Sequence, residues 1–144
     1  MKGRVALGAD EHGPVVDGVV ATLEALGFEV ERGPAGPWGR VARTASERVA
    51  SGEACFAVLC CWTGTGVSIV ANKVAGIRAA LCVDAATAAG ARKWNDANVL
   101  CLSMRLTTAH VAAEIVEAWV GTAYAASEGE SLACILDLEA HSVR

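Results

Sequence analysis

The chain has 144 residues, of which 53% are hydrophobic, 5% aromatic and 19% charged, and its net charge is −4. This length fits one domain over residues 1–144, and the charge balance excludes a nucleic-acid-binding protein because no basic stripe is available to neutralise phosphates. The mean hydropathy is +0.39, yet the longest unbroken apolar run covers only residues 54–62, far short of the ~20 residues that a membrane-spanning helix needs. We therefore expect no membrane contact, and we expect the surplus apolar residues to be buried in the core or between subunits.

Apolar runs alternate with segments of helical periodicity in the first half of the chain. In chain order we expect a strand at 4–8, a helix at 14–26, a strand at 28–30, a loop at 33–39, a helix at about 41–51 and a strand in the run 54–62. Pro14 suits the first helical turn, and Gly27 suits the position just beyond the helix end. The last run is continuously apolar, which is typical of a parallel strand buried on both faces.

The same alternation continues through the second half. In chain order we expect a short helix at about 67–73, a strand at 77–82, a helix, a strand at 99–102 and two further helices. Asp84 is expected to cap the helix between these strands, and Thr107 or Thr108 the helix after them. Capping-box spacing in Ser127-Glu128-Gly129-Glu130 predicts the start of a C-terminal helix. Strict alternation with short connections predicts an α/β fold, in which helices cover both faces of a five-stranded parallel sheet.

The six cysteines do not have the spacing of a metal site or of a Cys-x-x-Cys redox motif. Four of them lie in apolar runs, where cysteine behaves as a small hydrophobic residue. The first residues do not read as a signal peptide. We therefore expect reduced thiols, a cytoplasmic location and no metal or other cofactor.

The strongest chemical signal lies where the third strand gives way to a glycine-rich turn, at residues 60–68. Cys61 ends the strand, and Gly64 and Gly66 let the backbone approach a ligand closely. A thiolate beside backbone N–H groups could remove a proton α to a carbonyl while those groups hold the enediolate oxygen. The alternative is a buried structural cysteine followed by a phosphate-binding turn. The adjacent Cys60 should face the other side of the sheet and serve only packing.

Polar residues also flank two other strands. Asp10, Glu11 and His12 follow the first strand, where they could bind hydroxyls or relay protons; the alternative is a solvated turn with an aspartate cap. Residues 93–98 precede the last strand and could equally form only a turn. Arg105 follows that strand, where it could hold an anionic substrate or remain a surface charge.

Three segments of the chain match a known pattern together. They are Asp10 with Gly13; the block from Cys61 to Cys82, which contains Cys61-x-Thr63-Gly64-x-Gly66-x-Ser68; and Asn95-Asp96-Ala97-Asn98 leading to Arg105. In these segments the chain resembles the family of type B ribose-5-phosphate isomerases and galactose-6-phosphate isomerase subunits, from about residue 3 to residue 124. The resemblance implies a Rossmann-like α/β/α sandwich with an extra C-terminal helix. It also implies a homodimer, or a tetramer, whose active sites are shared between subunits.

The resemblance implies a function as well. In this family an aldose and a ketose interconvert through an enediolate without a metal, which makes Cys61 the base and Thr63 its helper at the hydroxyls. The turn's backbone N–H groups would stabilise the enediolate, Asp10 and Asn95 would bind sugar hydroxyls, and Arg105 would face the phosphate end of a carbohydrate substrate. The full set of expected substrate contacts is Asp10, Glu11, His12, Trp62, Gly64, Thr65, Gly66, Ser68, Trp94, Asn95 and Arg105.

The departures from the family pattern point in one direction, because acids and tryptophans stand where family members carry imidazole, basic or small groups. They are Glu11 (with His12 one place later), Trp62, Trp94, Trp38 in the region of a missing Asp-Tyr-Pro segment, and Glu128 and Glu130 in place of late arginines. An acid repels a phosphate dianion, and a tryptophan adds an apolar face. We hypothesise that the proton-transfer core is kept and that the substrate lacks a phosphate. The alternative is an ordinary sugar-phosphate isomerase that uses Arg105, Arg40 or Arg43.

Two other classes of function are open. One is a catalytically silent binding or assembly protein that has kept the fold. The other is a thiol redox protein that uses Cys60 and Cys61, although adjacent residues on opposite faces of a strand would make a strained disulfide.

Overall fold

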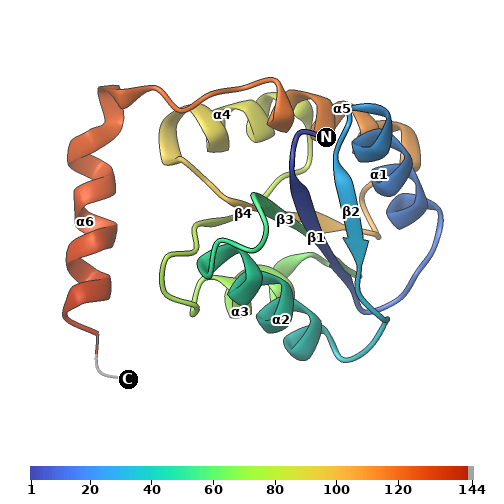
Figure 1. Ribbon diagram of the computed structural model, residues 1–144, viewed down its shortest axis with the longest axis horizontal. Helices are drawn as coiled ribbons and strands as arrows, with labels where there is room; N and C mark the ends of the chain where they lie inside the picture. The colour runs from blue at the N-terminus through green and yellow to red at the C-terminus, as the bar shows by residue number, and fades with distance from the viewer. Residues whose placement is uncertain (143–144) are drawn as a thin grey trace.

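The computed structural model describes residues 1–142, with one five-stranded sheet at the centre of the molecule (Figure 1). The strands are β1 (Arg4–Ala9), β2 (Glu29–Arg32), β3 (Phe56–Cys61), β4 (Ala79–Leu81) and β5 (Val99–Ser103). The pairings are parallel, and the strand order is β2-β1-β3-β5-β4. The expected α/β fold around a five-stranded parallel sheet is confirmed.

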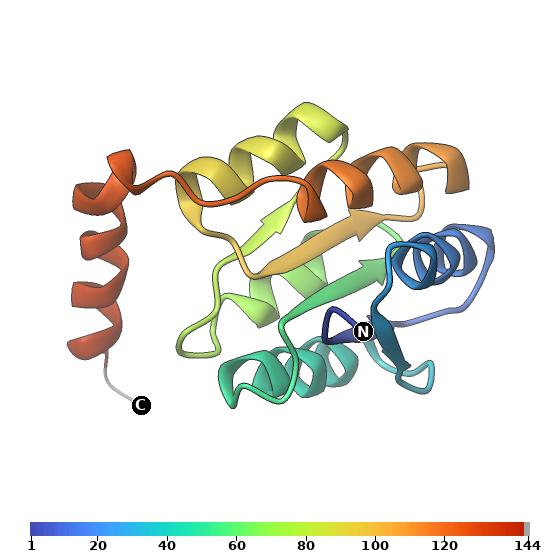
Figure 2. The same ribbon diagram turned by 45° about the horizontal axis from the view of Figure 1, so that its top comes forward.

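Helices cover both faces of this sheet. They are α1 (Pro14–Ala25), α2 (Trp38–Ala50), α3 (Thr65–Ala71), α4 (Ala85–Asn95), α5 (Ala109–Val120) and, after a 3-10 turn (Ala126–Glu128), α6 (Gly129–Ala140). Helices α1, α4 and α5 form one layer, α2 and α3 form the other, and α6 stands beside the sandwich (Figures 1 and 2). None of these helices, within residues 1–142, is long and apolar enough to cross a lipid bilayer.

The side chains of β3 alternate between two buried clusters, one under each helical layer. Val58 and Cys60 lie with α1, α4 and α5, where Trp119 of α5 is buried. Leu59 and Cys61 lie with α2 and α3. Because side chains alternate along a strand, the adjacent cysteines lie on opposite faces of the sheet, as the sequence predicts.

Most of the expected helix ends are present. Pro14 is the first residue of α1, and Gly27, with a φ of 92°, follows the C-cap of that helix. The Asp84 carboxylate caps α4 by accepting a backbone N–H at 2.7 Å. Of the two threonines considered for α5, Thr108 is the cap, and Thr107 is buried before it.

Helix α3 begins at Thr65, two residues before its expected start, and α2 and α6 also begin elsewhere than expected. The backbone N–H groups of Arg40 and Val41 donate to the carbonyl of Pro37, so α2 begins at Trp38, inside the segment expected to be a loop. The prediction of a capping box at the last helix is wrong. Ser127 lies within a 3-10 turn, and α6 starts after that turn without a side-chain cap.

Strand β4 is shorter than expected because two asparagine side chains bind the backbone at its start. Asn98 donates to the carbonyl of Gly76 at 2.9 Å and accepts the N–H of Arg78 at 2.8 Å. Asn72 likewise binds both backbone groups of Ala79, donating at 3.0 Å and accepting at 2.8 Å. These amides take the place of ladder hydrogen bonds around the α3–β4 connection.

Helix α6 has no buried residue and lies apart from the sandwich (Figure 2). Its Leu136 and Leu138 side chains are 61% and 70% exposed. The Glu139 carboxylate accepts the backbone N–H of Gly76 at 2.9 Å, which ties the helix to the α3–β4 connection. The two leucines are two residues apart and so lie on different sides of the helix, and large apolar side chains this exposed are typical of a helix that packs against another chain.

Candidate active site

The carboxyl ends of β1, β3 and β5 lie side by side in the middle of the sheet. The backbone N–H of Asp10 donates to the carbonyl of Cys60 at 3.3 Å, and that of Arg105 donates to the carbonyl of Trp62 at 2.9 Å. The structure therefore brings the three loops that follow these strands together at one edge. This is the edge where parallel α/β sheets bind ligands.

The Cys61 thiol ends β3 on the side of the sheet that α2 and α3 cover. It is 4% exposed, and its sulfur accepts the backbone N–H of Gly64 at 3.2 Å. Gly64 is the N-cap of α3 and has a left-handed φ of 74°. A Cβ atom at this position would lie 2.5 Å from Cδ1 of Leu81 and 3.0 Å from the backbone of β5. Only glycine fits here, so the close approach of the turn to the sulfur depends on it.

Cys60, by contrast, is sealed in the opposite layer. Burial raises the pKa of Cys60 to about 12, and the neighbouring Cys61 and Asp10 add to this increase. The pKa of Cys101 is also raised, mainly by burial and to a smaller extent by the neighbouring thiols. A hydrogen bond with the Ser68 hydroxyl acts in the opposite direction and lowers this pKa. Ser68, an expected substrate contact, therefore turns its hydroxyl toward a buried thiol.

Two hydroxyls lie on the exposed side of the glycine turn. The Oγ1 atoms of Thr63 and Thr65 are 2.7 Å apart, which is a hydrogen bond in which either atom can be the donor. Both side chains are exposed. The expected helper Thr63 is thus joined to a second expected site residue.

Two of the three tryptophans singled out from the sequence lie at this turn. The Trp38 ring packs on Gly66, where an added Cβ would lie 2.9 Å from its Cε3 atom. Trp38 and Trp62 are 48% and 60% exposed, so each keeps an open apolar surface. Trp94 packs instead against Gly90 of its own helix. The three rings do not line one pocket within a single chain.

Trp94 and Asn95 lie at the opposite edge of the sheet from Cys61. Both residues end α4, immediately before the amino end of β5, whereas Cys61 is the last residue of the parallel neighbour β3. The separation is roughly one strand length, about 17 Å. Trp94 and Asn95 therefore do not lie beside Cys61 within one chain, and their assignment as substrate contacts stays a prediction.

The loop after β1 holds an unpartnered acceptor. The Asp10 Oδ1 atom is buried and has no hydrogen-bond partner among the described residues, and such an oxygen needs a water or a ligand hydroxyl. His12 turns away toward β2, where its Nδ1 accepts from Nε of Arg32 at 3.2 Å, and Arg32 also binds Asp17 at 2.8 Å. Glu11 is exposed. Sequence reasoning missed Arg32, because no local signal marks a charged residue at the end of an edge strand.

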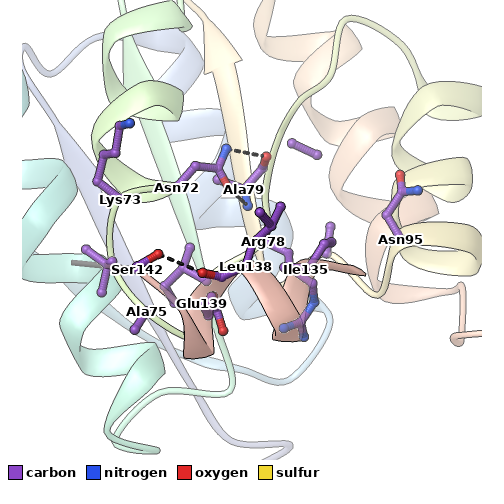
Figure 3. A pocket seen from close by; sticks show the side chains of 14 residues that line it. Asn72, Lys73, Ala75, Arg78, Ala79, Asn95, Ile135, Leu138, Glu139 and Ser142 are labelled. Carbon is purple, nitrogen blue, oxygen red and sulfur yellow. Dashed lines mark hydrogen bonds between the residues drawn. The ribbon is translucent and has the colours of Figure 1, made fainter. Parts of the chain in front are cut away.

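A cavity of about 760 Å³ lies between α6 and the α3–β4 connection (Figure 3). Its polar lining residues are Asn72, Lys73, Arg78, Asn95, Glu139 and Ser142. The expected substrate contact Asn95 therefore lines this cavity. Sequence reasoning missed the cavity, because its outer wall depends on where α6 lies.

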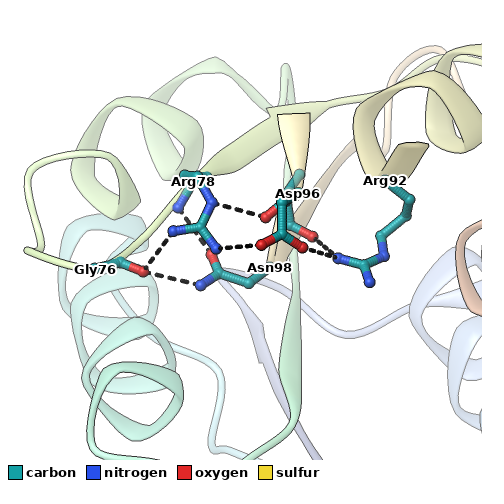
Figure 4. Close-up of polar contacts among 6 residues, drawn as sticks. Gly76, Arg78, Arg92, Asp96 and Asn98 are labelled. Atoms are coloured by element: carbon teal, nitrogen blue, oxygen red, sulfur yellow. Dashed lines mark hydrogen bonds and ion pairs between the residues drawn. The ribbon is translucent and has the colours of Figure 1, made fainter. Parts of the chain in front are cut away.

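Asp96, at the base of this region, sits between two arginines (Figure 4). Its carboxylate accepts from Arg78 at 3.3 Å and from Arg92 at 3.4 Å, and its carbonyl accepts from Nε of Arg78 at 2.7 Å. Asp96 has a φ of 45°, a left-handed conformation that aspartate adopts more readily than most residues. The network fixes the backbone directly after Asn95.

The three arginines considered for an anionic substrate have different surroundings. Arg105 is exposed at the carboxyl edge, and its side chain forms no ion pair with the residues that the structure describes. Arg40 lines a separate cavity of about 220 Å³ under the loop at 33–37. Arg43 pairs with Glu47 at 2.7 Å. Arg105 is therefore the cation best placed beside the Cys61 loops.

Comparison with known proteins gives consistent results. The family model described as Ribose/Galactose Isomerase matches residues 5–134. The chain is 37% identical over 129 residues to ribose-5-phosphate isomerase B of Escherichia coli (strain K12), covering 84% of this chain and 85% of that protein. It is 31% identical over 128 residues to 4-deoxy-4-sulfo-D-erythrose isomerase of Clostridium sp. (strain MSTE9), covering 84% and 80%. The solved structure of type B ribose 5-phosphate isomerase from Trypanosoma brucei is similar with a TM-score of 0.87 and 40% identity, over 94% of this chain and 97% of that one.

Proposed function

The chain belongs to the ribose/galactose isomerase family and is an isomerase; from that premise we propose that it interconverts an aldose and a ketose with Cys61 as the acid–base group. The observation that carries the proposal is the 3.2 Å hydrogen bond from the Gly64 N–H to the Cys61 sulfur. It holds the sulfur at the carboxyl end of the central strand β3, beside the glycine turn, and the thiolate is the form that removes a proton in the proposed reaction.

The proposed reaction moves one proton between adjacent carbons. The Cys61 thiolate takes the proton from C2 of an open-chain aldose, the C–H electron pair forms the C=C bond of an enediolate, and O1 gains the negative charge. Backbone N–H groups of the turn at Gly64–Gly66 donate to that oxygen. The same thiol returns the proton to C1. The Thr63 hydroxyl gives a proton to O1 and receives one from O2, so that the protons balance.

The matched pair Cys61→Ala and Cys60→Ala tests the role of the thiol, because both residues are buried at the end of one strand but on opposite faces. Incorporation of solvent deuterium at the carbon next to the carbonyl, followed by NMR, should fall by about 10²-fold or more in Cys61→Ala, with the thermal unfolding midpoint little changed. Cys60→Ala should keep its exchange rate. Unchanged exchange in Cys61→Ala would refute the assignment. Ligand binding without exchange in the wild-type chain would favour the silent binding protein.

We further propose that the substrate lacks a terminal phosphate. Around the Cys61 loops the exposed Glu11 adds negative charge, and the Trp38 and Trp62 rings add apolar surface beside the turn. Family relatives act on phosphorylated sugars and, in one case, on a sulfo sugar by name, so the anionic end of the substrate varies among them.

Thermal shift and deuterium exchange with D-ribose, D-erythrose and ribose 5-phosphate test this substrate proposal. A ligand present at 100 times its Kd stabilises the folded state by about 2.7 kcal/mol, which is easily measured. An unphosphorylated sugar should stabilise the chain and exchange its proton. If only ribose 5-phosphate stabilised the chain, the proposal that the substrate lacks a phosphate would be refuted, and the proposed role of Cys61 would be unaffected.

We also propose that the active form is a homodimer with shared sites. Cys61 and Asn95 lie at opposite edges of the sheet in one chain, and Asn95 faces the cavity beside the projecting α6 (Figure 3). A second copy whose Cys61 turn enters that cavity would unite the two. Variants of Cys61 and of Asn95, each inactive alone, should then recover part of the activity when mixed, because some mixed dimers carry one intact site.

A further inference from the structure

The Thr63 and Thr65 hydroxyls form a pair on the exposed side of the glycine turn, with their oxygens 2.7 Å apart. Thr65 is the first residue of α3, and Thr63 precedes the N-cap Gly64. The backbone between them is held in place on its buried side, because the N–H of Gly64 donates to the Cys61 sulfur. The hydroxyl pair is therefore built on the same segment of backbone that carries the thiol.

We infer that Thr65 is a positioning residue, whose hydroxyl holds the Thr63 hydroxyl in the one orientation that serves proton exchange with the sugar oxygens. This inference rests on the proposed function, in which Thr63 is the hydroxyl helper. A threonine on an exposed turn otherwise samples more than one staggered χ1 rotamer and a freely rotating O–H. The bond to Thr65 removes both freedoms.

The direction of donation matters for this role. When Thr65 donates to Thr63, it engages one of the two lone pairs of the Thr63 oxygen. The Thr63 proton then remains free for the sugar oxygen O1, and the second lone pair can receive the proton from O2. A neighbouring donor also makes the second hydroxyl a better donor, because hydrogen bonds in a chain polarise one another. Thr65 thus prepares Thr63 to give a proton without touching the substrate itself.

Within residues 1–142, the Thr65 hydroxyl forms no hydrogen bond other than the one to Thr63. The N-cap of α3 is Gly64, and the cap makes no side-chain hydrogen bond. Valine has the shape of threonine and the same branching at Cβ, so Thr65→Val removes the hydroxyl while the first turn of the helix is kept. The exposed position leaves no buried polar group behind.

Three variants make the test: Thr65→Val, the conservative Thr65→Ser, and the matched control Thr22→Val. Thr22 bears a hydroxyl that bonds to the Gly18 carbonyl within α1, away from the site. We expect Thr65→Val to lower kcat about tenfold with KM within about twofold, because it disturbs the orientation of a reacting group and not the binding of the sugar. Thr65→Ser should recover most of the loss, and Thr22→Val should match the wild-type chain.

A second measurement does not depend on activity. Three-bond couplings from the Thr63 methyl carbon to its backbone N and C′ report χ1, and they should show one rotamer in the wild-type chain and averaging in Thr65→Val. A single rotamer in both chains overturns the inference, whatever the kinetics show. If the wild-type chain exchanged no sugar proton, the proposed function would be refuted. If Thr65→Val nevertheless lost the single Thr63 rotamer, the positioning contact itself would still be established.

A double-mutant cycle completes the test. If Thr65 acts only through Thr63, adding Thr65→Val to Thr63→Val should cause no further loss of kcat. Additive losses would show that Thr65 acts on the substrate directly, which overturns its role as a positioning residue.

Discussion

The backbone N–H of Gly64 donates to the sulfur of Cys61 across 3.2 Å, and thereby joins the residue that ends the central strand to the N-cap of the next helix. The thiol is positioned by a backbone conformation and not by another side chain. Its placement should therefore be sensitive to any residue that changes the turn, even where no polar group is removed.

Gly64→Ala is the sharpest test of this dependence. The left-handed φ of 74° and a Cβ only 2.5 Å from Leu81 Cδ1 act together, so we expect a loss of about 3 kcal/mol in the free energy of unfolding and a loss of proton exchange. Gly52→Ala is the control, because its φ is 81° but no heavy atom lies within 4 Å of the added Cβ. It should lose only about 1–2 kcal/mol, the conformational part. Urea unfolding measures both, and equal losses would show that the close approach is unimportant.

The buried Cys60 thiol predicts a loss of stability in alkaline solution. Burial raises its pKa from 9.0 to about 12, so the unfolded chain gives up this proton first as the pH increases. The contribution of this thiol to the free energy of unfolding is fully present below about pH 9. Between pH 9 and about pH 12 the free energy of unfolding falls by up to roughly 1.4 kcal/mol per pH unit. Cys60→Ala should reduce that slope in urea titrations at several pH values, whereas the exposed Cys134→Ala should not. Parallel slopes for wild-type and Cys60→Ala chains would contradict the prediction.

The ion pairs of Asp96 predict a stability effect larger than that of a surface pair. Arg78 and Arg92 both bind its carboxylate and are about three-quarters covered, so Asp96→Asn, which still tolerates the left-handed turn, should lose about 1–3 kcal/mol. Glu47→Gln breaks the exposed pair with Arg43 and should lose less than about 0.5 kcal/mol. Chemical denaturation compares the two variants. Similar small losses in both variants would mean that the Asp96 ion pairs contribute little to the free energy of unfolding.

The exposed leucines of α6 predict its part in assembly. Replacing Leu136 and Leu138 together by glutamate should convert the proposed dimer to a monomer, since burial of each leucine is worth about 1.5–3 kcal/mol. The double replacement by methionine keeps the apolar surface and should leave the dimer intact. Light scattering coupled to size-exclusion chromatography measures the mass. A glutamate variant of unchanged mass would place the interface elsewhere.

Local signals in the sequence were enough for much of the fold. The Asp84 cap and the glycine after α1 act within a few residues, so they could be predicted without knowledge of the rest. The capping box at Ser127 had the right spacing, but the chain entered α6 through a 3-10 turn. Spacing alone does not decide which residue becomes the cap.

The site was predictable only where its residues follow strands. The loops that carry Asp10, Cys61 and Arg105 lie side by side because parallel strands end at one edge of the sheet. The amino-edge position of Asn95 could have been found in the same way, since it precedes a strand. The contact between Arg32 and His12 depends on β2 lying beside β1, a pairing between distant segments that no local pattern specifies.

Asn72 has a consequence for the behaviour of the chain in concentrated solution. β4 is the last strand in the sheet order, so the outer side of its backbone has no partner strand among residues 1–142 and would otherwise template the strand of another molecule. At this edge the Asn72 side-chain amide binds both the N–H and the carbonyl of Ala79. It makes the hydrogen bonds that a neighbouring strand would make there. An edge blocked in this way resists edge-to-edge aggregation, and this protection would be lost with Asn72 even though no core residue had changed.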